Sequence, residues 1–476
     1  MERAQLLKAA RLQKHLTREQ AAERLGVDPS TVKRWENGTS TPQPINLHSI
    51  TEVYGITPQQ LGLSEFPQSK ETPVATQNAM DFEDEDEEDA ITVFRKQDIT
   101  SRLTHLVWNW LLACHHARYQ ELQTLIALEL EGYSRMHPDN INRRNALRRL
   151  ALLAIDLCAL SVYQPVIKRP IEEILTYCAS GIVACWYLRK GKELAFVNDA
   201  VSKYIPTLQE LVKSAPEPQR KAAADLLAQS LLLKATCVEQ LYGNYAASLQ
   251  YRKQAETYSE QAGNPALSVA TMRAQAVSHD YAHNWEQAMH TTIKAKNVME
   301  SAETKETPSL MLQSYVYAGL ANYQVHTGTM YKQDALTLIE RAEEAFRAAQ
   351  ENKETAPIWI GYDEGNLLLH SGHAYHHLGM SQKAIDSFAR IGDLKDSHET
   401  YRVEAIIDQA MAEVNREDRL PDMAFCIDRW TQGIQGAIAM HSKEKFTLAV
   451  HAYATMRAVW RGEQRIKDLR DLIVHW

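Results

Sequence analysis

Residues 16–42, LTREQAAERLGVDPSTVKRWENGTSTP, contain the helix-start and helix-end signals of the N-terminal part of the chain. Thr17 and Gln20 fit a capping box, in which the Thr17 hydroxyl accepts from the Gln20 amide and the Gln20 side chain reaches back. Gly26 can take the left-handed conformation that ends a helix. Pro29 suits the first position of the next helix, where its missing N–H costs nothing. The pattern predicts two short helices joined by a tight turn.

The same kind of punctuation continues along the chain. Asn37-Gly38 closes the second of these helices after little more than two turns. Thr57-Pro58-Gln59-Gln60 repeats the arrangement of a threonine cap, a proline and a glutamine at the start of a later helix. We therefore expect five short helices within residues 1–65.

The two central helices would separate an apolar face from a polar one. The apolar residues expected to face one another are Ala21, Ala22, Leu25, Val27, Val32 and Trp35. The residues expected to project outward from the second helix are Ser30, Thr31, Lys33 and Arg34. Two short helices joined by a glycine-containing turn form the DNA-reading helix-turn-helix. Any small helical bundle needs caps and an apolar stripe, but that alternative does not explain an outward face suited to bases and phosphates.

Residues 16–42, followed by a helix and YGITPQQL at 54–61, resemble the lambda-repressor-like (Cro/XRE-type) helix-turn-helix domain. The resemblance implies a recognition helix whose N-terminal residues touch base edges in the major groove. Carried over by position, the base-reading residues would be Pro29, Ser30, Thr31, Lys33 and Arg34. Arg34 is the strongest candidate, because a bidentate contact from arginine to guanine is the commonest specific contact.

The resemblance also implies contacts to the DNA backbone. The residues expected to hold phosphates are Arg18, Lys14, Asn37 and Thr39. Arg18 departs from the family pattern, in which glutamine is frequent at that position. Arg11 and Glu36 match an ion pair of the family, so we expect them to support the fold and not to touch DNA.

The charge of the chain is concentrated in one short segment. The whole sequence has a net charge of −8, and residues 66–90 alone hold Lys70 against Glu71 and eight further acidic residues. The core of this segment is DFEDEDEED at 81–89. A block of like charges repels itself, so residues 66–92 should be an extended, disordered linker. The sharper alternative is an acidic tether that competes with DNA for the basic N-terminal module.

From Ile99 onward the apolar residues keep helical spacing, and one repeated unit is clear. NLLLHSGHAYHHLGMSQKAIDSFARI, residues 366–391, resembles a tetratricopeptide repeat, with Gly372 where two helices approach and Phe388 on the returning helix. Small residues expected at the same place in the returning helices are Ser248, Ala288, Ala335, Ala384 and Ala424. We expect residues 93–476 to form an α-solenoid of such helix pairs, with the run from His441 as a capping helix or an interface.

Four histidines form the most suggestive group for metal chemistry: His370, His373, His376 and His377. His373 and His377 share a helical face, as metal ligands would. They lie inside the clearest repeat, however, where side chains must pack or line the groove, so the sequence favours that role and predicts no metal site. No phosphate-binding loop or catalytic group is recognisable, and we expect neither a cofactor nor enzymatic activity.

The composition fits a helical cytoplasmic protein. Hydrophobic residues make up 45% and charged residues 24%, as in globular domains, and the 19 glycines are few for a turn-rich β protein. Six cysteines lie far apart without a C-x-x-C pair, which indicates reduced thiols. The start of the chain does not look like a secretory signal, and the longest uncharged stretch is shorter than a membrane-spanning helix.

The sequence thus predicts an all-α transcriptional regulator with a helix-turn-helix at 1–65, a linker at 66–92 and a repeat domain at 93–476. The order of modules resembles peptide-pheromone-responsive regulators, which implies a homodimer, a double-stranded DNA operator and a peptide or protein effector in the repeat groove. The competing hypothesis is a repeat-based interaction scaffold without a direct role in transcription.

We predict different effects for two arginine substitutions. Arg34→Ala should relax specificity at one base pair by about 1–3 kcal/mol, whereas Arg18→Ala should weaken binding to all sequences alike. Binding measured on the preferred duplex and on single-base variants checks this. Equal losses on every duplex from both changes would contradict the assignment.

Overall fold

The computed structural model describes residues 3–14, 16–25, 27, 29–37, 53, 99–112, 119–136, 143–152, 170–301, 308–354, 356–394 and 397–474. The chain divides into two compact units, Met1–Asp86 and Glu87–Trp476. The elements assigned within the described ranges are helices and no strand is among them, which confirms the all-α prediction. The predicted linker and the fourth and fifth helices of residues 1–65 lie outside the described residues, apart from residue 53.

Three short helices form the described part of the N-terminal unit: α1 (Arg3–Gln13), α2 (Arg18–Leu25) and α3 (Pro29–Glu36). The capping box at the start of α2 is complete. The Gln20 amide donates to Oγ1 of Thr17 at 3.2 Å, and Oε1 of Gln20 accepts from the Thr17 amide at 3.0 Å. At the other end of α2 the Val27 amide donates to the carbonyl of Ala22 at 2.9 Å, which satisfies one of the last carbonyls of the helix.

The small core of this unit matches the predicted apolar face. Ala21, Ala22, Leu25, Val32 and Trp35 are all buried, and Leu7 and Ala10 of α1 pack in the same cluster. Because these side chains hold α3 against α1 and α2, the opposite side of α3 is left to solvent. The two helices are therefore as the sequence predicts, with Val27 partly buried against the same core, whereas Gly26 of the turn lies outside the described residues.

The second unit opens with α6 (Ile99–Leu112), α7 (Tyr119–Met136), α9 (Ile171–Leu188) and α10 (Leu194–Ser214). Five helix pairs follow. Their first helices are α11 (Gln219–Tyr242), α13 (Pro265–Tyr281), α15 (Leu310–Thr327), α17 (Glu364–His377) and α19 (Glu399–Val414). Their second helices are α12 (Tyr245–Ala262), α14 (Trp285–Glu300), α16 (Lys332–Glu351), α18 (Ser381–Asp393) and α20 (Met423–Ala439).

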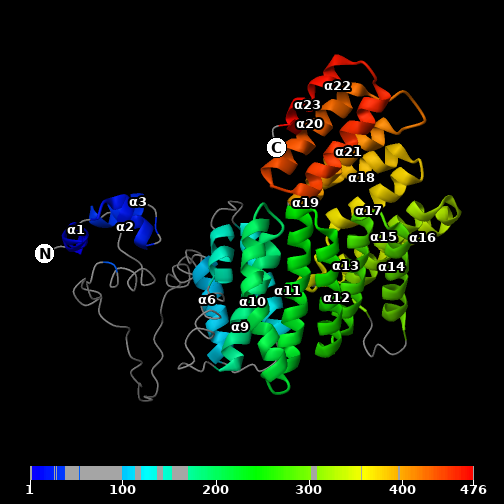
Figure 1. Ribbon diagram of the computed structural model, residues 1–476. Helices are drawn as coiled ribbons and strands as arrows, with labels where there is room; N and C mark the ends of the chain where they lie inside the picture. The colour runs from blue at the N-terminus through cyan, green and yellow to red at the C-terminus, as the bar shows by residue number, and fades with distance from the viewer. Residues whose placement is uncertain are drawn as a thin grey trace, which may run out of the picture. The chain divides into compact units, whose positions relative to one another are not determined.

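The chain ends with α21 (Lys443–Val459) and two short helices, α22 (Gln464–Asp468) and α23 (Arg470–Val474). Two 3₁₀ turns, η1 (Thr329–Tyr331) and η2 (Ile358–Ile360), lie in the connections beside α16 and α17. Each helix packs on the next along the chain, so α10 to α16 stand side by side (Figure 1). None of the helices described is long and apolar enough to cross a bilayer.

Two glycine–asparagine pairs fix the connections of the first repeats. Gly243 and Gly263 take the left-handed conformation, with φ of 62° and 69°, directly after α11 and α12. The next residues, Asn244 and Asn264, accept from the backbone amides three positions on and cap the following helices. Because glycine enters this conformation without steric cost, the chain can reverse within two residues. Each helix therefore lies antiparallel to its neighbour.

A small buried residue marks the second helix of each pair, four positions after its N-cap. Ser248, Ala288, Ala335 and Ala384 occupy this position and are fully buried, as predicted. The prediction for α20 was wrong. Ala424 is exposed, and the fully buried residue four positions after the N-cap Asp422 is Cys426. The intervals between these positions vary along the chain, so the spacing did not distinguish Ala424 from the buried position two residues later.

The series of helix pairs curls back on itself. Oγ of Ser442, at the start of α21, donates to the carbonyl of Gln240 in α11 at 3.2 Å, although the two residues are 202 positions apart. Helices α11 and α21 pack against each other as well as against their sequence neighbours. The first helices of the pairs therefore surround a common interior, and the second helices cover them from outside.

We expect Gly372→Ala to destabilise the repeat unit. A Cβ at this position would lie 2.4 Å from Cε1 of Phe388, a side chain that is itself fully buried in α18. Overpacking of this kind costs about 1–3 kcal/mol, which urea or thermal unfolding of the full chain can measure.

Gly392→Ala is the matched control. Gly392 also lies in a helix but, unlike Gly372, it is exposed, and a Cβ added there would meet no atom within 4 Å. There the substitution should leave stability unchanged or raise it slightly, since alanine is the better helix former. Equal unfolding free energies for the two variants would contradict the close approach of α17 and α18.

Candidate functional site

Helix α3 presents basic and polar side chains to solvent. Lys33 and Arg34 are exposed, Pro29 begins the helix and is exposed, and Thr31 is half-buried. Nη2 of Arg34 donates to Oγ1 of Thr31 at 3.2 Å, so the guanidinium lies along the first turn of the helix. The structure thus brings four of the five predicted base-reading residues together on one helix. The backbone of Ser30 belongs to the same helix, and its side chain lies outside the described residues.

A buried carboxylate ties α3 to the two preceding helices. Glu36 accepts from Nε of Arg11 at 2.5 Å and from Nε of Arg18 at 2.8 Å. Burial alone would raise the pKa of Glu36, but the hydrogen bonds from the two arginines outweigh it and lower the pKa. The expected framework pair of Arg11 and Glu36 is therefore confirmed. Arg18 belongs to the same network, which gives it a structural contact in addition to the phosphate contact predicted for it.

The other predicted phosphate-binding residues are only partly described. Lys14 follows α1 and Asn37 follows α3, and both are exposed. Thr39 lies outside the described residues. The phosphate contacts of Arg18, Lys14, Asn37 and Thr39 stay predictions, since they concern a bound duplex.

The second candidate site is a cavity in the interior of the repeat unit. It has a volume of about 310 Å³ and is lined mainly by side chains of α13, α15, α17, α19 and α21. Single residues of the second helices (Tyr245, Trp285 and Phe388) and His283 of the α13–α14 connection complete the lining. Its histidines are His283, His326, His373, His376, His377 and His451, and its carboxylates are Asp280, Glu404, Asp408 and Glu444. The interior of a helical repeat is usually apolar, so this concentration of ionisable side chains is the distinctive feature of the unit.

The four histidines of the predicted cluster separate in the structure. His370 is buried, and its Nε2 lies 2.9 Å from Nη2 of Arg273. His373 instead faces α19, where Nε2 lies 2.7 Å from Oδ2 of Asp408. His377 lies against His326 of α15, with ring centroids 3.7 Å apart. The histidine pair suggested by helical spacing, His373 and His377, is therefore not the group that the structure assembles.

Electrostatics distinguish His373 from the histidines nearer the surface. Burial opposes its charged form, but Asp408 and Glu404 outweigh that effect and raise the pKa of His373 to about 9. Burial and the neighbouring His377 lower the pKa of His326 to about 2. Burial also raises the pKa of the cavity-lining Asp280 to about 6.

Glu404 and Asp408 were missed by the sequence analysis. They stand four residues apart in α19, which places both carboxylates on one helical face, but many solvated helices show the same spacing. What distinguishes them is their partner. His373 comes from α17, 31 positions before Glu404, and only the packing of the two helices brings them together.

Comparison with known protein families gives a match in the N-terminal unit. Residues 7–61 match the family model described as Helix-turn-helix. This segment is a Cro/XRE-type helix-turn-helix. No curated protein matches the chain.

Among solved structures, the chain is similar to a Signal Transduction ATPase with Numerous Domains (STAND) protein with a tetratricopeptide repeat sensor from Pyrococcus horikoshii. The sequence identity is 14% and the TM-score is 0.37. The match covers 80% of this chain and 53% of that one, so this chain corresponds to about half the length of that protein.

Glu36→Gln should destabilise the helix-turn-helix specifically. The side chain of Glu36 is 2% exposed and binds two arginines, and removing one partner of a buried ion pair costs about 3 kcal/mol or more. Hydrogen exchange of the full chain should show faster exchange of the amides in α1 to α3 and no change in α11 to α21. Glu19→Gln, at an exposed position of α2, is the control and should have little effect.

The same carboxylate predicts a dependence on pH. Because folding lowers the pKa of Glu36 below its ordinary value of 4.5, its stabilising contribution is present above that pH and is lost as the pH falls through the lower, folded value. The Glu36→Gln variant should lack this component. Identical acid unfolding of α1 to α3 in the wild type and the variant would show that the ion pair contributes nothing.

Proposed function

We propose that this protein is a sequence-specific DNA-binding transcriptional regulator that acts in the cytoplasm and has no catalytic activity of its own. The observation that carries the proposal is α3 of the helix-turn-helix, whose apolar side is buried in the core while Lys33 and Arg34 are exposed. Insertion of this helix into the major groove would place its first two turns against base edges. The ion pairs of Glu36 would hold α3 at a fixed angle to α2 during that contact.

The modest charge of the helix-turn-helix itself supports a homodimer. Residues 1–38 hold eight basic and five acidic side chains, a net charge of +3. Phosphate neutralisation supplies most of the sequence-independent affinity for DNA, so one such unit would bind weakly at physiological salt. Two units on one operator would double the number of phosphate contacts and match a pseudo-palindromic site.

We further propose that the repeat unit receives an effector, a peptide or a protein, in the groove formed by the first helices of its pairs. Support comes from the interior lining of this unit, which carries charged side chains where a purely structural repeat would carry apolar ones. Peptide backbones and side chains require such groups for specific recognition. An effector bound there would change how two N-terminal units are spaced on DNA.

Selection of bound duplexes from a random pool by the full chain tests the first proposal. We expect a defined, roughly two-fold symmetric sequence, with affinity that falls steeply as salt rises. Lys14→Ala should weaken binding to all sequences alike, because we expect this exposed lysine to contact phosphates and not bases. Arg34→Ala should instead reduce the sequence specificity at one base pair of the operator. Repeating the selection with cell extract would reveal an effector as a change in half-site spacing or affinity.

The interaction scaffold predicts a different result. A chain that does not read DNA would show no salt-dependent duplex binding and would enrich no sequence from the pool. That result would refute the regulator while leaving the repeat unit as a protein-binding module.

A further inference from the structure

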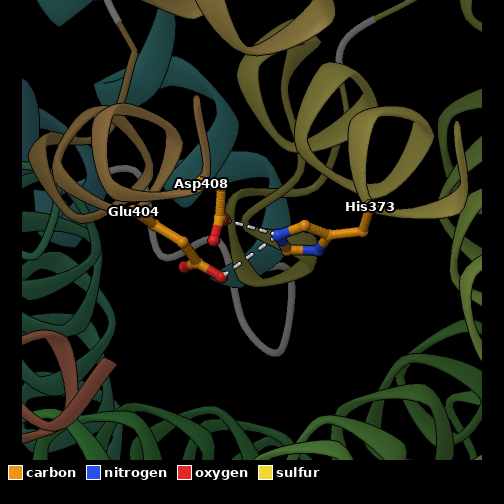
Figure 2. A group of neighbouring side chains, drawn as sticks. All are labelled: His373, Glu404 and Asp408. Atoms are coloured by element: carbon orange, nitrogen blue, oxygen red, sulfur yellow. Dashed lines mark hydrogen bonds and ion pairs between the residues drawn. The ribbon is translucent and has the colours of Figure 1, made fainter. Parts of the chain in front are cut away.

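Three side chains of metal-binding type converge inside the repeat unit. His373 projects from α17, and Glu404 and Asp408 project from the facing helix α19, so that all three point toward one another (Figure 2). Their side chains are largely withdrawn from solvent, with exposed fractions of 21% for His373, 6% for Glu404 and 13% for Asp408. The group comes from two consecutive helix pairs and therefore exists only in the packed solenoid.

The distances within this group are close to those of a coordination shell. Nε2 of His373 lies 2.7 Å from Oδ2 of Asp408 and 3.8 Å from Oε1 of Glu404, and the three ligand atoms lie within 4.8 Å of one another. Atoms bound at about 2.0–2.2 Å to a tetrahedral zinc ion are roughly 3.4 Å apart. To reach that spacing, the imidazole of His373 and the carboxylate of Asp408 would have to move apart, and Glu404 would have to move slightly toward His373.

The two oxygens of Glu404 have different surroundings. Nζ of Lys445 donates to Oε2, and the hydroxyl of Tyr281 lies 3.5 Å from the same oxygen. Oε1 is the oxygen that faces His373. Lys445, which is 1% exposed, thus orients the carboxylate and leaves one oxygen directed at the imidazole, as outer partners of metal ligands do.

The charge of the cavity also favours a cation. Four carboxylates line it: Asp280, Glu404, Asp408 and Glu444. Among the described residues of this lining there is no lysine or arginine. Lys445 forms ion pairs with Glu404 and Glu444 but does not itself line the cavity. These four carboxylates thus face a described lining that supplies no lysine or arginine of its own, in an interior where unbalanced charge is costly.

We propose that His373, Glu404 and Asp408 bind one divalent transition-metal ion through Nε2, Oε1 and a carboxylate oxygen of Asp408. One imidazole and two carboxylates form a three-ligand set of the kind that leaves a fourth position open, here toward the cavity. Binding would replace the hydrogen bond between Nε2 of His373 and Asp408 by two bonds to the ion, and any proton held between them would pass to solvent.

The remaining histidines form a route from the surface to this group. Three exposed histidines lie at the mouth of the cavity: His283, His377 and His451. The ring centroids of His283 and His451 are 6.3 Å apart. Deeper in, His326 lies against His377 and stacks on Trp285 at 4.8 Å. An ion could exchange water for these imidazoles on its way to the carboxylates.

Calorimetric titration of Zn²⁺ into the full chain, after treatment with a chelator and dialysis, tests the proposal. We expect one ion per chain, and a loss of affinity of at least about 100-fold in His373→Asn and in Asp408→Asn, since even outer partners of ligands contribute 10–100-fold. The control is His290→Asn, an exposed histidine of α14, which should bind as the wild type does. No binding by the wild type, or unchanged affinity in Asp408→Asn, would overturn the proposal. The contact between His373 and Asp408 would then be an ion pair without a metal-binding role.

A measurement on the wild-type chain keeps the test decisive if the variants fold poorly. X-ray absorption of the Co²⁺-loaded protein counts imidazole ligands, and the proposed set supplies one. Two or more imidazoles would place the ion among the other histidines of the cavity, such as His326 and His377, and would overturn the assignment. The DNA-binding proposal does not depend on either outcome.

Discussion

Close packing of paired helices is the constraint on which the repeat unit depends. Each second helix carries a small, fully buried residue one turn after its N-cap, and at α17 the matching contact is between Gly372 and the ring of Phe388. A larger side chain at these points would separate the helices and expose the apolar faces that only a neighbour covers. Because the constraint recurs in every pair, small rotations accumulate until α21 reaches α11.

Charged residues lie in the interior of the repeat unit, where they pair with one another. Glu404 comes from α19 and Lys445 and Glu444 from α21, two helices that pack against each other, and each of the three is almost fully buried. Buried ions require partners with good geometry, so this group is stable only when α19 and α21 hold their relative positions. A ligand or ion that binds to these carboxylates would therefore report on, and influence, the curvature of the unit.

The N-terminal unit is stabilised in a different way, because it has few residues to form a core. Its core is small, and a buried carboxylate shared by two arginines links α1, α2 and α3 where apolar contacts are few. The ion pairs fix the orientation of α3, and the exposed Lys33 and Arg34 depend on that orientation. Stability and the geometry of the candidate DNA-binding surface thus rest on the same side chain, Glu36.

The local features of the helices could be predicted from the amino-acid sequence. Capping boxes, proline at the first helical position and glycine after a helix act within a few residues, so they predicted the bounds of α2 and α3 and the pair around Gly372. The sequence did not allow contacts between residues distant along the chain to be predicted. The burial of Cys426 in place of Ala424, the separation of the histidines around His373 and the approach of Glu404 and Asp408 to His373 follow from helix packing, which no local pattern encodes. Tertiary structure decided these, because a ligand set drawn from two helices exists only after both have packed.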